Sequence, residues 1–300
     1  MLKRIIIGSI VFIALYGGFV HFQVTTSRHK NGASDSPEAA RSEPPHKVYA
    51  FSFSKFTPEG QKEIDIEGDS ADIFSNTVGL INVVAKAYAE EVPVTITADT
   101  GSYNKSENKV HLRENVVATT ADGTRLLTEE LDIFPTNKVM ETEVGVQVKR
   151  DNINVEGDGA RGDSQLKKVR FKKNVTVVIR STGEDELTGK PGGGPTIITC
   201  DGPLTINYEK NIAHFQDNVV AEDARGKLMA DTMDVYYNKV TSKVSKIVAL
   251  GDVVIENPDG NQTFSDSVIY LADEGRVILG GDTEALYYEN SSSAAGGGIL

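Results

Sequence analysis

The sequence predicts an all-β fold made of repeat modules stacked in tandem, preceded by one apolar N-terminal segment. Residues 97–117 reappear as residues 199–220, and residues 126–134 resemble residues 228–236. A shorter repeat of about 30 residues runs inside this long one. A fixed repeat of this size indicates units that cannot bury their apolar faces alone and that complete one core by stacking.

The period within each unit is two, which is typical of a β-strand. In residues 92–98 and 109–113 the even positions are apolar and most odd positions are polar. One face of each strand is therefore expected to be buried and the other to meet water. We expect strands to begin near Ile66, Thr97, Leu127, Val155, Thr199, Met229 and Phe264, with second starts near Asn115, Asn174, Asn218 and Asp252.

Turn residues separate the expected strands, as in Asp122-Gly123 and in Asn257-Pro258-Asp259-Gly260-Asn261. Leu126 and Leu127 break the alternation, which predicts a bulge. Residues 85–90 have a helix-friendly composition, but they are few and lie between strand-like runs, so we expect a strand.

The N-terminus predicts a membrane anchor in residues 1–24. Lys3 and Arg4 precede an apolar run over residues 5–20. This run is long for a signal peptide and just long enough to cross a bilayer, and no cleavage site or lipid-accepting cysteine follows it. We favour an uncleaved anchor over a cleaved signal peptide, with the N-terminus in the cytoplasm and the remaining chain exported.

Three polar segments are expected to lie outside the folded modules. Residues 25–47 are rich in Ser, Pro, Ala and charged residues, which favours a flexible stalk. Residues 182–195 are rich in Gly and Pro and form either a linker between two modules or a long surface loop on a continuous sheet. Residues 290–300 are rich in Gly and Ser and are expected to form a disordered tail.

Composition excludes several classes of function. The chain has 31 basic and 43 acidic residues and a net charge of −12, which argues against nucleic acid or an anionic membrane surface as the main partner. The single cysteine allows no disulfide within the chain. We find no phosphate-binding glycine loop, no H-E-x-x-H, no cysteine pair and no G-x-S-x-G, so we predict neither catalysis nor a cofactor or metal site.

The residues that could carry chemistry have simpler structural interpretations. His111 and His214 occupy equivalent repeat positions, opposite the apolar face, and are expected to be surface histidines rather than metal ligands. Cys200 falls at a small-residue position and is expected to be a half-buried thiol. Acids recur at one strand position and are expected to accept backbone N–H bonds rather than form a catalytic pair: Asp99, Glu129, Asp201, Asp231 and Asp266.

Particular segments resemble two known families. Residues 51–60, 71–74, 112–116, 123–131 and 155–159 look like the LptC family of lipopolysaccharide export, and this resemblance covers residues 48–181. The second module, residues 196–289, resembles the OstA-like (LptA-type) domain of the same pathway. The usual inner-membrane member carries one such module, whereas this chain looks like a fusion of two.

The resemblance implies a β-jellyroll whose apolar interior shelters the acyl chains of lipopolysaccharide. Each CH₂ group exposed to water costs about 0.8 kcal/mol, so a carrier must cover these chains. The implied function is non-enzymatic transport from an inner-membrane ABC transporter along a periplasmic bridge. The implied partners are lipopolysaccharide, the permease subunits and an LptA-type bridge protein. The implied location is the inner membrane, with a single pass and most of the chain in the periplasm.

Alternation predicts which side chains point inward and would line the lipid groove. They are Val94, Ile96, Val110, Leu112 and Val116 in the first module, and Ile198, Phe215, Val219, Met233 and Val235 in the second.

The ends of a stacked sheet carry unpaired strand edges that recruit other strands. We expect an N-terminal edge at Phe51, Phe53 and Phe56 to face the transporter. A C-terminal edge over residues 268–286, with Val268, Val277 and Leu279 as the candidate residues, is expected to receive the bridge protein. Two other functions remain open at this stage: a secreted β-solenoid enzyme that acts on polysaccharide, and a structural or adhesive repeat protein tethered to the membrane.

Overall fold

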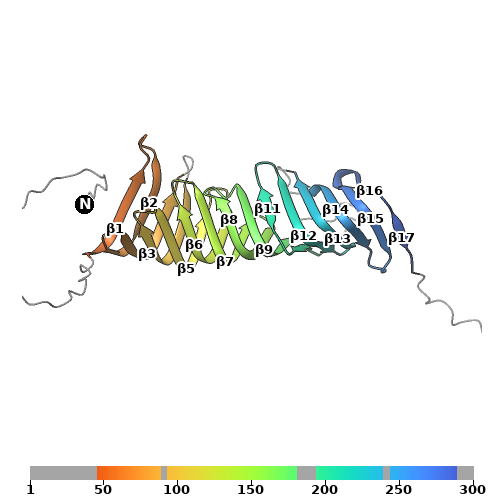
Figure 1. Cartoon of the computed structure of the whole chain (residues 1–300), viewed down its shortest axis with the longest axis horizontal. Helices are drawn as coiled ribbons and strands as arrows, with labels where there is room; N and C mark the ends of the chain where they lie inside the picture. The colour runs from red at the N-terminus through yellow and green to blue at the C-terminus, as the bar shows by residue number, and fades with distance from the viewer. Residues whose placement is uncertain (1–45, 89–92, 181–193, 239–243, 289–300) are drawn as a thin grey trace, which may run out of the picture. The chain divides into compact units, whose positions relative to one another are not determined.

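The computed structural model of the chain describes residues 46–88, 93–180, 194–238 and 244–288 (Figure 1). In these residues seventeen strands belong to one sheet, and the one helical element is the short 3₁₀ turn η1 (Ala272–Glu274). The all-β prediction is confirmed. None of the described residues forms a helix long and apolar enough to cross a membrane. The predicted anchor, most of the stalk, residues 182–193 and the tail lie outside the described residues.

The strands follow one another in chain order: β1 (His46–Phe56), β2 (Lys62–Ile73), β3 (Thr77–Ala87), β4 (Val94–Asn104), β5 (Lys109–Thr119), β6 (Arg125–Phe134), β7 (Val139–Arg150), β8 (Ile153–Asp163), β9 (Lys168–Ile179), β10 (Thr196–Cys200), β11 (Leu204–Asn207), β12 (Ile212–Asp223), β13 (Gly226–Tyr237), β14 (Val244–Glu256), β15 (Gln262–Leu271), β16 (Arg276–Gly280) and β17 (Glu284–Leu286).

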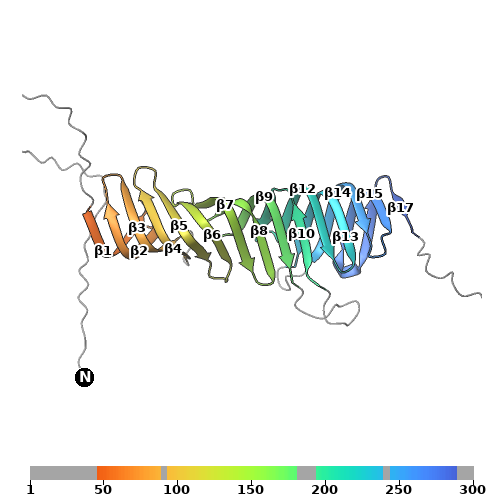
Figure 2. The same ribbon diagram turned by 90° about the horizontal axis from the view of Figure 1, so that it is seen from below.

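From β1 to β9 and from β12 to β16 each strand pairs antiparallel with its neighbours along the chain, and Figure 2 shows these strands side by side. β10 and β11 together take the place of one strand between β9 and β12. Thr199 of β10, for example, lies opposite Thr176 of β9. The hydrogen-bonded sheet therefore continues from β9 to β12, on both sides of the segment for which we expected a linker or a surface loop.

Most long strands bury side chains in both halves and expose their centre. In β5, Val110 and Leu112 are buried, and Val116 and Ala118 are buried again after three exposed residues. Asn115, within this exposed stretch, has a positive φ of 53°, and the pairing with β6 shifts register there. Such a bulge bends a strand, so that both of its halves can turn the same face inward.

The bends divide the sheet into two layers around one core (Figure 1). The first layer contains the strand halves paired around Val110 and Leu112, and the second contains those around Val116 and Ala118. Rings from strands that are not neighbours meet in the interior: the centroids of Phe53 in β1 and Tyr103 in β4 lie 5.8 Å apart. The core is therefore enclosed between the two layers of a single folded sheet.

An asparagine–aspartate pair recurs where the strands bend. In each pair the asparagine Nδ2 donates to the aspartate Oδ2 at 2.6 Å. The asparagines have φ between 51° and 53°, a left-handed conformation that asparagine tolerates better than most residues. We call these four pairs the corner pairs: Asn82–Asp69, Asn115–Asp99, Asn174–Asp158 and Asn218–Asp201.

The corner pairs correct two predictions. Asn115, Asn174, Asn218 and Asp252 do not start strands but lie in the middle of β5, β9, β12 and β14, because their turn-like backbone bends a strand without ending it. In the described hydrogen bonds Asp99 and Asp201 accept from a side-chain amide rather than from a backbone N–H. Asp266 does accept a backbone N–H, from Asp282 at 3.2 Å.

Three smaller predictions can also be compared with the strands. The bulge predicted at Leu126 and Leu127 is wrong, because both residues stay in the β6–β7 ladder, which shifts register only after Thr128. Leu127 simply lies on the outer, half-buried face. The strand predicted at residues 85–90 is confirmed up to Ala87. β1 begins at His46, two residues inside the predicted stalk.

The corner pairs predict a specific loss of stability. Asn115→Ala removes the bond to Asp99 and places an alanine in the left-handed region, so we expect the free energy of unfolding to fall by about 1–2 kcal/mol. Asn115→Gly removes the same bond but suits the backbone, and it should lose less. Urea unfolding of the three proteins measures this, and equal stability of wild type and Asn115→Ala would contradict the role given to the corner.

Candidate functional site: the apolar interior and its two ends

All ten predicted groove residues lie in the interior between the two layers. None has more than 4% of its surface exposed. They come from β4, β5, β10, β12 and β13 and belong to one cluster of buried apolar side chains. Whether they contact a lipid stays a prediction, but alternation identified their direction correctly.

The apolar interior continues from the first half of the chain into the second. Phe171 of β9 and Phe215 of β12, the largest fully buried side chains, lie on two strands that flank the short strands β10 and β11. The buried hydroxyls of the first half differ, because Thr124 Oγ1 and Ser164 Oγ have no hydrogen-bond partner whereas others are satisfied locally. Thr128, for example, donates to the carbonyl oxygen of Gly145 at 2.9 Å.

A small apolar cavity of about 50 Å³ lies where the two halves meet. This is far below the roughly 300–1,000 Å³ typical of ligand pockets, so the interior is nearly closed in this conformation. Burial raises the pKa of Tyr208 and raises the pKa of Tyr237 to about 12, because an apolar surrounding disfavours the phenolate. The cavity is lined by Ile153, Val177, Ile179, Ile198, Ile206, Tyr208, Ala213, Phe215, Val235, Tyr237 and Val244.

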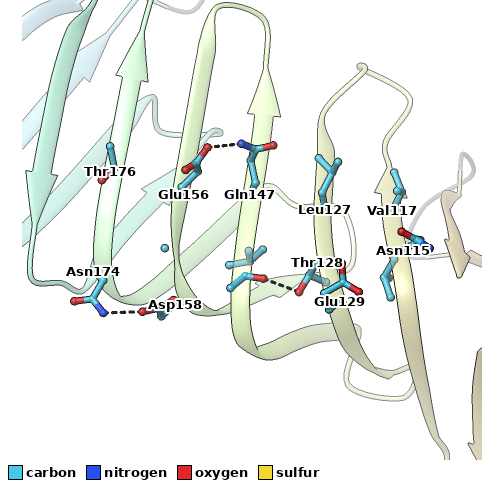
Figure 3. Close-up of a pocket in the computed structure, with 14 residues that line it drawn as sticks. Asn115, Val117, Leu127, Thr128, Glu129, Gln147, Glu156, Asp158, Asn174 and Thr176 are labelled. Atoms are coloured by element: carbon cyan, nitrogen blue, oxygen red, sulfur yellow. Dashed lines mark hydrogen bonds between the residues drawn. The ribbon is translucent and has the colours of Figure 1, made fainter.

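A second, wider hollow of about 640 Å³ lies along β5 to β9 (Figure 3). Its lining is mixed, with Leu127 and Val117 beside polar groups that already bond one another. Gln147 donates to Glu156, and Asn174 donates to Asp158. Among the described residues no group of three or more His, Cys, Asp or Glu could hold a metal ion. The hollow brings together no set of groups that forms a recognisable catalytic arrangement.

The two repeat histidines carry partners that the sequence analysis missed. His111 Nδ1 lies 2.6 Å from Asp132 Oδ1, and His214 Nδ1 lies 2.5 Å from Asp234 Oδ1. Each aspartate lies directly opposite its histidine on the next strand. The alignment of the repeats contained this signal, because Asp132 and Asp234 are equivalent positions. The pairs lie on the partly exposed outer face.

Cys200 is more buried than expected. Its side chain is in the core, and burial raises the pKa of its thiol. A thiol with a raised pKa is a poor nucleophile. Cys200 is therefore a packing residue of β10.

The N-terminal end of the sheet is β1, which in the described residues pairs only with β2. Phe51 and Phe53 are half-buried and pack against the core, with ring centroids 6.4 Å apart. Phe56 is exposed. The three phenylalanines therefore differ: two cover the end of the core and one faces solvent.

The C-terminal end is formed by β16 and β17, each of which pairs only with β15 in the described part of the chain. Val277 and Leu279 are 49% and 37% exposed, as expected of edge residues. Val268 is wrong as an edge residue: it is 2% exposed, because it lies in β15 opposite Leu279 and turns into the core. Ile278 and Leu286, within the predicted edge region, are exposed as well, and so are Tyr287 and Tyr288, which lie beyond it.

Comparison with known families agrees with this architecture. A family profile described as "Lipopolysaccharide-assembly, LptC-related" matches residues 9–180, which is more than half of the chain. A second profile, described as "LptA/(LptD N-terminal domain) LPS transport protein", matches residues 202–300. A search of curated proteins finds no match. The chain belongs to the LptC-related family and carries an LptA/LptD_N-type segment after it.

The two cavity tyrosines predict a pH dependence. A tyrosine whose pKa is raised by folding stabilises the fold fully below its ordinary pKa of 10.0, and this contribution is lost as the pH rises through the raised value. We therefore expect the free energy of unfolding to fall between pH 10 and about 12, with a shallower fall in Tyr237→Phe.

Denaturant titrations across this range, with the ultraviolet absorbance of tyrosinate, measure the effect. Tyr287→Phe removes an exposed tyrosine and is the matched control. An equally steep fall in Tyr237→Phe and wild type would contradict the assignment.

Proposed function

We propose that this member of the LptC-related family is a non-enzymatic carrier that moves lipopolysaccharide from an inner-membrane ABC transporter toward the outer membrane. Residues 1–24 anchor it by a single pass, and the rest of the chain lies in the periplasm. The acyl chains are sheltered between the two layers of a β-jellyroll. One observation carries this proposal above all: the apolar interior runs without a break through both family-matched segments.

The interior supplies what an amphiphile needs. Covering one CH₂ group is worth about 0.8 kcal/mol, and inward side chains provide apolar contact along every strand from β2 to β15. The sugar stays in water outside. Because the interior is nearly filled in this conformation, the layers must separate to admit a chain.

The corners favour such a separation. Each long strand passes from one layer to the other at its bulge, so the layers are joined by backbone on that side. On the opposite side the strands end in turns, and the contact described there is between side chains, Arg150 and Tyr208. The sheet can therefore open about the corners without breaking its ladders.

The continuous ladder at the junction favours transfer inside one molecule. Ile198 of β10 pairs with Val177 of β9 and with Ala221 of β12. An acyl chain that passes from the LptC-related half to the LptA-type half therefore need not cross water.

The two ends suit protein partners that add strands. In the described part of the chain β1 has an unpaired edge, which suits the permease subunits, and β16 with β17 has another, which suits an LptA-type bridge protein. Exposed apolar side chains on β16, such as Val277 and Leu279, add apolar area to be buried there. A strand edge with apolar neighbours is a natural site for such pairing.

The alternatives have less support. A polysaccharide-active enzyme needs acids gathered on one wet face, whereas Asp99 and Asp201 are each bonded within a corner pair. A structural or adhesive tether accounts for the repeats but gives no reason for an interior that continues across the junction. The tether would also bind no lipid, which the first experiment below decides.

Photo-crosslinking tests the carrier function. A photoreactive residue at Leu112 or Phe215 is expected to capture lipopolysaccharide in cells, because both side chains point inward. The same residue at the neighbouring positions His111 or His214, on the outer face, should capture none. Equal capture from both faces would refute the groove, and no capture from any position would favour the tether.

A proline tests the polarity of docking. Val277→Pro removes a backbone donor from β16, so we expect it to weaken binding of the bridge protein while transporter subunits are retained. Val277→Thr keeps the donor and is the control. The measurement is a pull-down of both partners from the same cells. Loss of the transporter with retention of the bridge protein would reverse the assignment of the two ends.

A further inference from the structure

A side-chain contact joins the two layers where the two halves of the chain meet. Arg150 is the last residue of β7, and its guanidinium carbon lies 4.4 Å from the ring centroid of Tyr208, which directly follows β11. β8 and β9 separate β7 from β11 in the sheet. The end of β7 belongs to the second layer, because its Val148 pairs with Leu126 of β6 in that layer. β11 belongs to the first layer. The contact therefore crosses the side opposite the corners.

Each partner is fixed within its own layer. Arg150 pairs with Asp122, at 3.1 Å, in the turn between β5 and β6. Asp122 in turn accepts the backbone N–H of Thr124 at 3.2 Å. On the other side the backbone N–H of Tyr208 donates to the carbonyl oxygen of Lys167 at 2.8 Å. The guanidinium and the ring thus connect two separately held rims.

The ring of Tyr208 also lines the junction cavity, together with Tyr237. Facing them are Ile153 and Ile179, at the ends of strands in the second layer. Apart from the two tyrosines, every lining side chain is aliphatic or Phe215. No charged residue is among the described residues that line the cavity, and three of the lining residues belong to the predicted groove.

We propose that this cavity is a discrete acyl-chain subsite at the junction of the two halves, and that Arg150 and Tyr208 form the latch that closes it. This inference rests on the proposed function and identifies a place where an acyl chain binds as it passes between the two halves. The aliphatic lining suits a hydrocarbon chain, and the cavity is continuous with apolar interior on both sides. Arg150 lies in the LptC-matched segment and Tyr208 in the LptA-type segment, so the latch joins the two.

The first test opens the latch in the full-length protein in detergent. Arg150→Ala and Tyr208→Ala each remove one partner of the cation–π contact. The probe is cis-parinaric acid, a fluorescent fatty acid. Because the cavity is then no longer held closed, we expect this probe to associate roughly three- to tenfold faster than with wild type. Tyr208→Phe keeps the ring and Lys149→Ala removes the exposed neighbour of Arg150, so both should bind at the wild-type rate. Unchanged rates in both latch variants would overturn the latch.

The second test fills the cavity. Ala213 and Ala221 are both half-buried in β12, but only Ala213 lines the cavity. Ala213→Leu is expected to weaken equilibrium binding of the fatty acid severalfold, and Ala221→Leu to change it little. Equal effects of the two substitutions would overturn the subsite. Thermal melts of all variants identify any that fail to fold.

The two proposals fail differently. If wild type captures lipopolysaccharide at Leu112 but latch variants do not alter the share captured at Phe215, the latch is wrong and the carrier function stands. If wild type binds neither lipopolysaccharide nor the fatty acid, both are wrong.

Discussion

The bend in the middle of the long strands is the constraint on which this structure depends. A single sheet has two faces and cannot enclose a core unless it folds over. Here the corner asparagines adopt a left-handed backbone, and each donates to an aspartate on the neighbouring strand or in the turn after it. The strand changes layer while its hydrogen-bonded ladder resumes on both sides. One alternating pattern can therefore place side chains from both strand halves in the same interior.

A sheet folded in this way can be lengthened by the addition of further strands at its ends. Each new strand extends the interior without closing it, so an LptC-related half and an LptA-type half can share one core. Among the described residues the same construction leaves an unpaired edge at β1 and another at β16 and β17. The side opposite the corners is bridged by contacts such as Arg150 with Tyr208, and these are weaker than a backbone ladder. The carrier that we propose is expected to open on this weaker side.

The sequence predicted the direction of side chains better than the limits of strands. Alternation placed Val110, Leu112 and Phe215 in the core, because a period of two persists on each side of a bulge. It misplaced strand starts at Asn115 and Asn218, since an asparagine with positive φ gives the same signal at a bulge as at a turn. The aspartate partners of His111 and His214 could have been found from the repeat. The contact between Arg150 and Tyr208 could not, because these two residues come together only when the sheet folds.

The central claim is that acyl chains lie between the layers, and tryptophan fluorescence tests it most directly. The chain has no tryptophan, so Phe215→Trp and His214→Trp each introduce a single reporter, one in the core and one on the outer face. An amphiphile with brominated acyl chains quenches a tryptophan only on close contact. The account predicts strong quenching at position 215 and little at position 214. Equal quenching at the two positions, or none at position 215 while the amphiphile is bound, would contradict it.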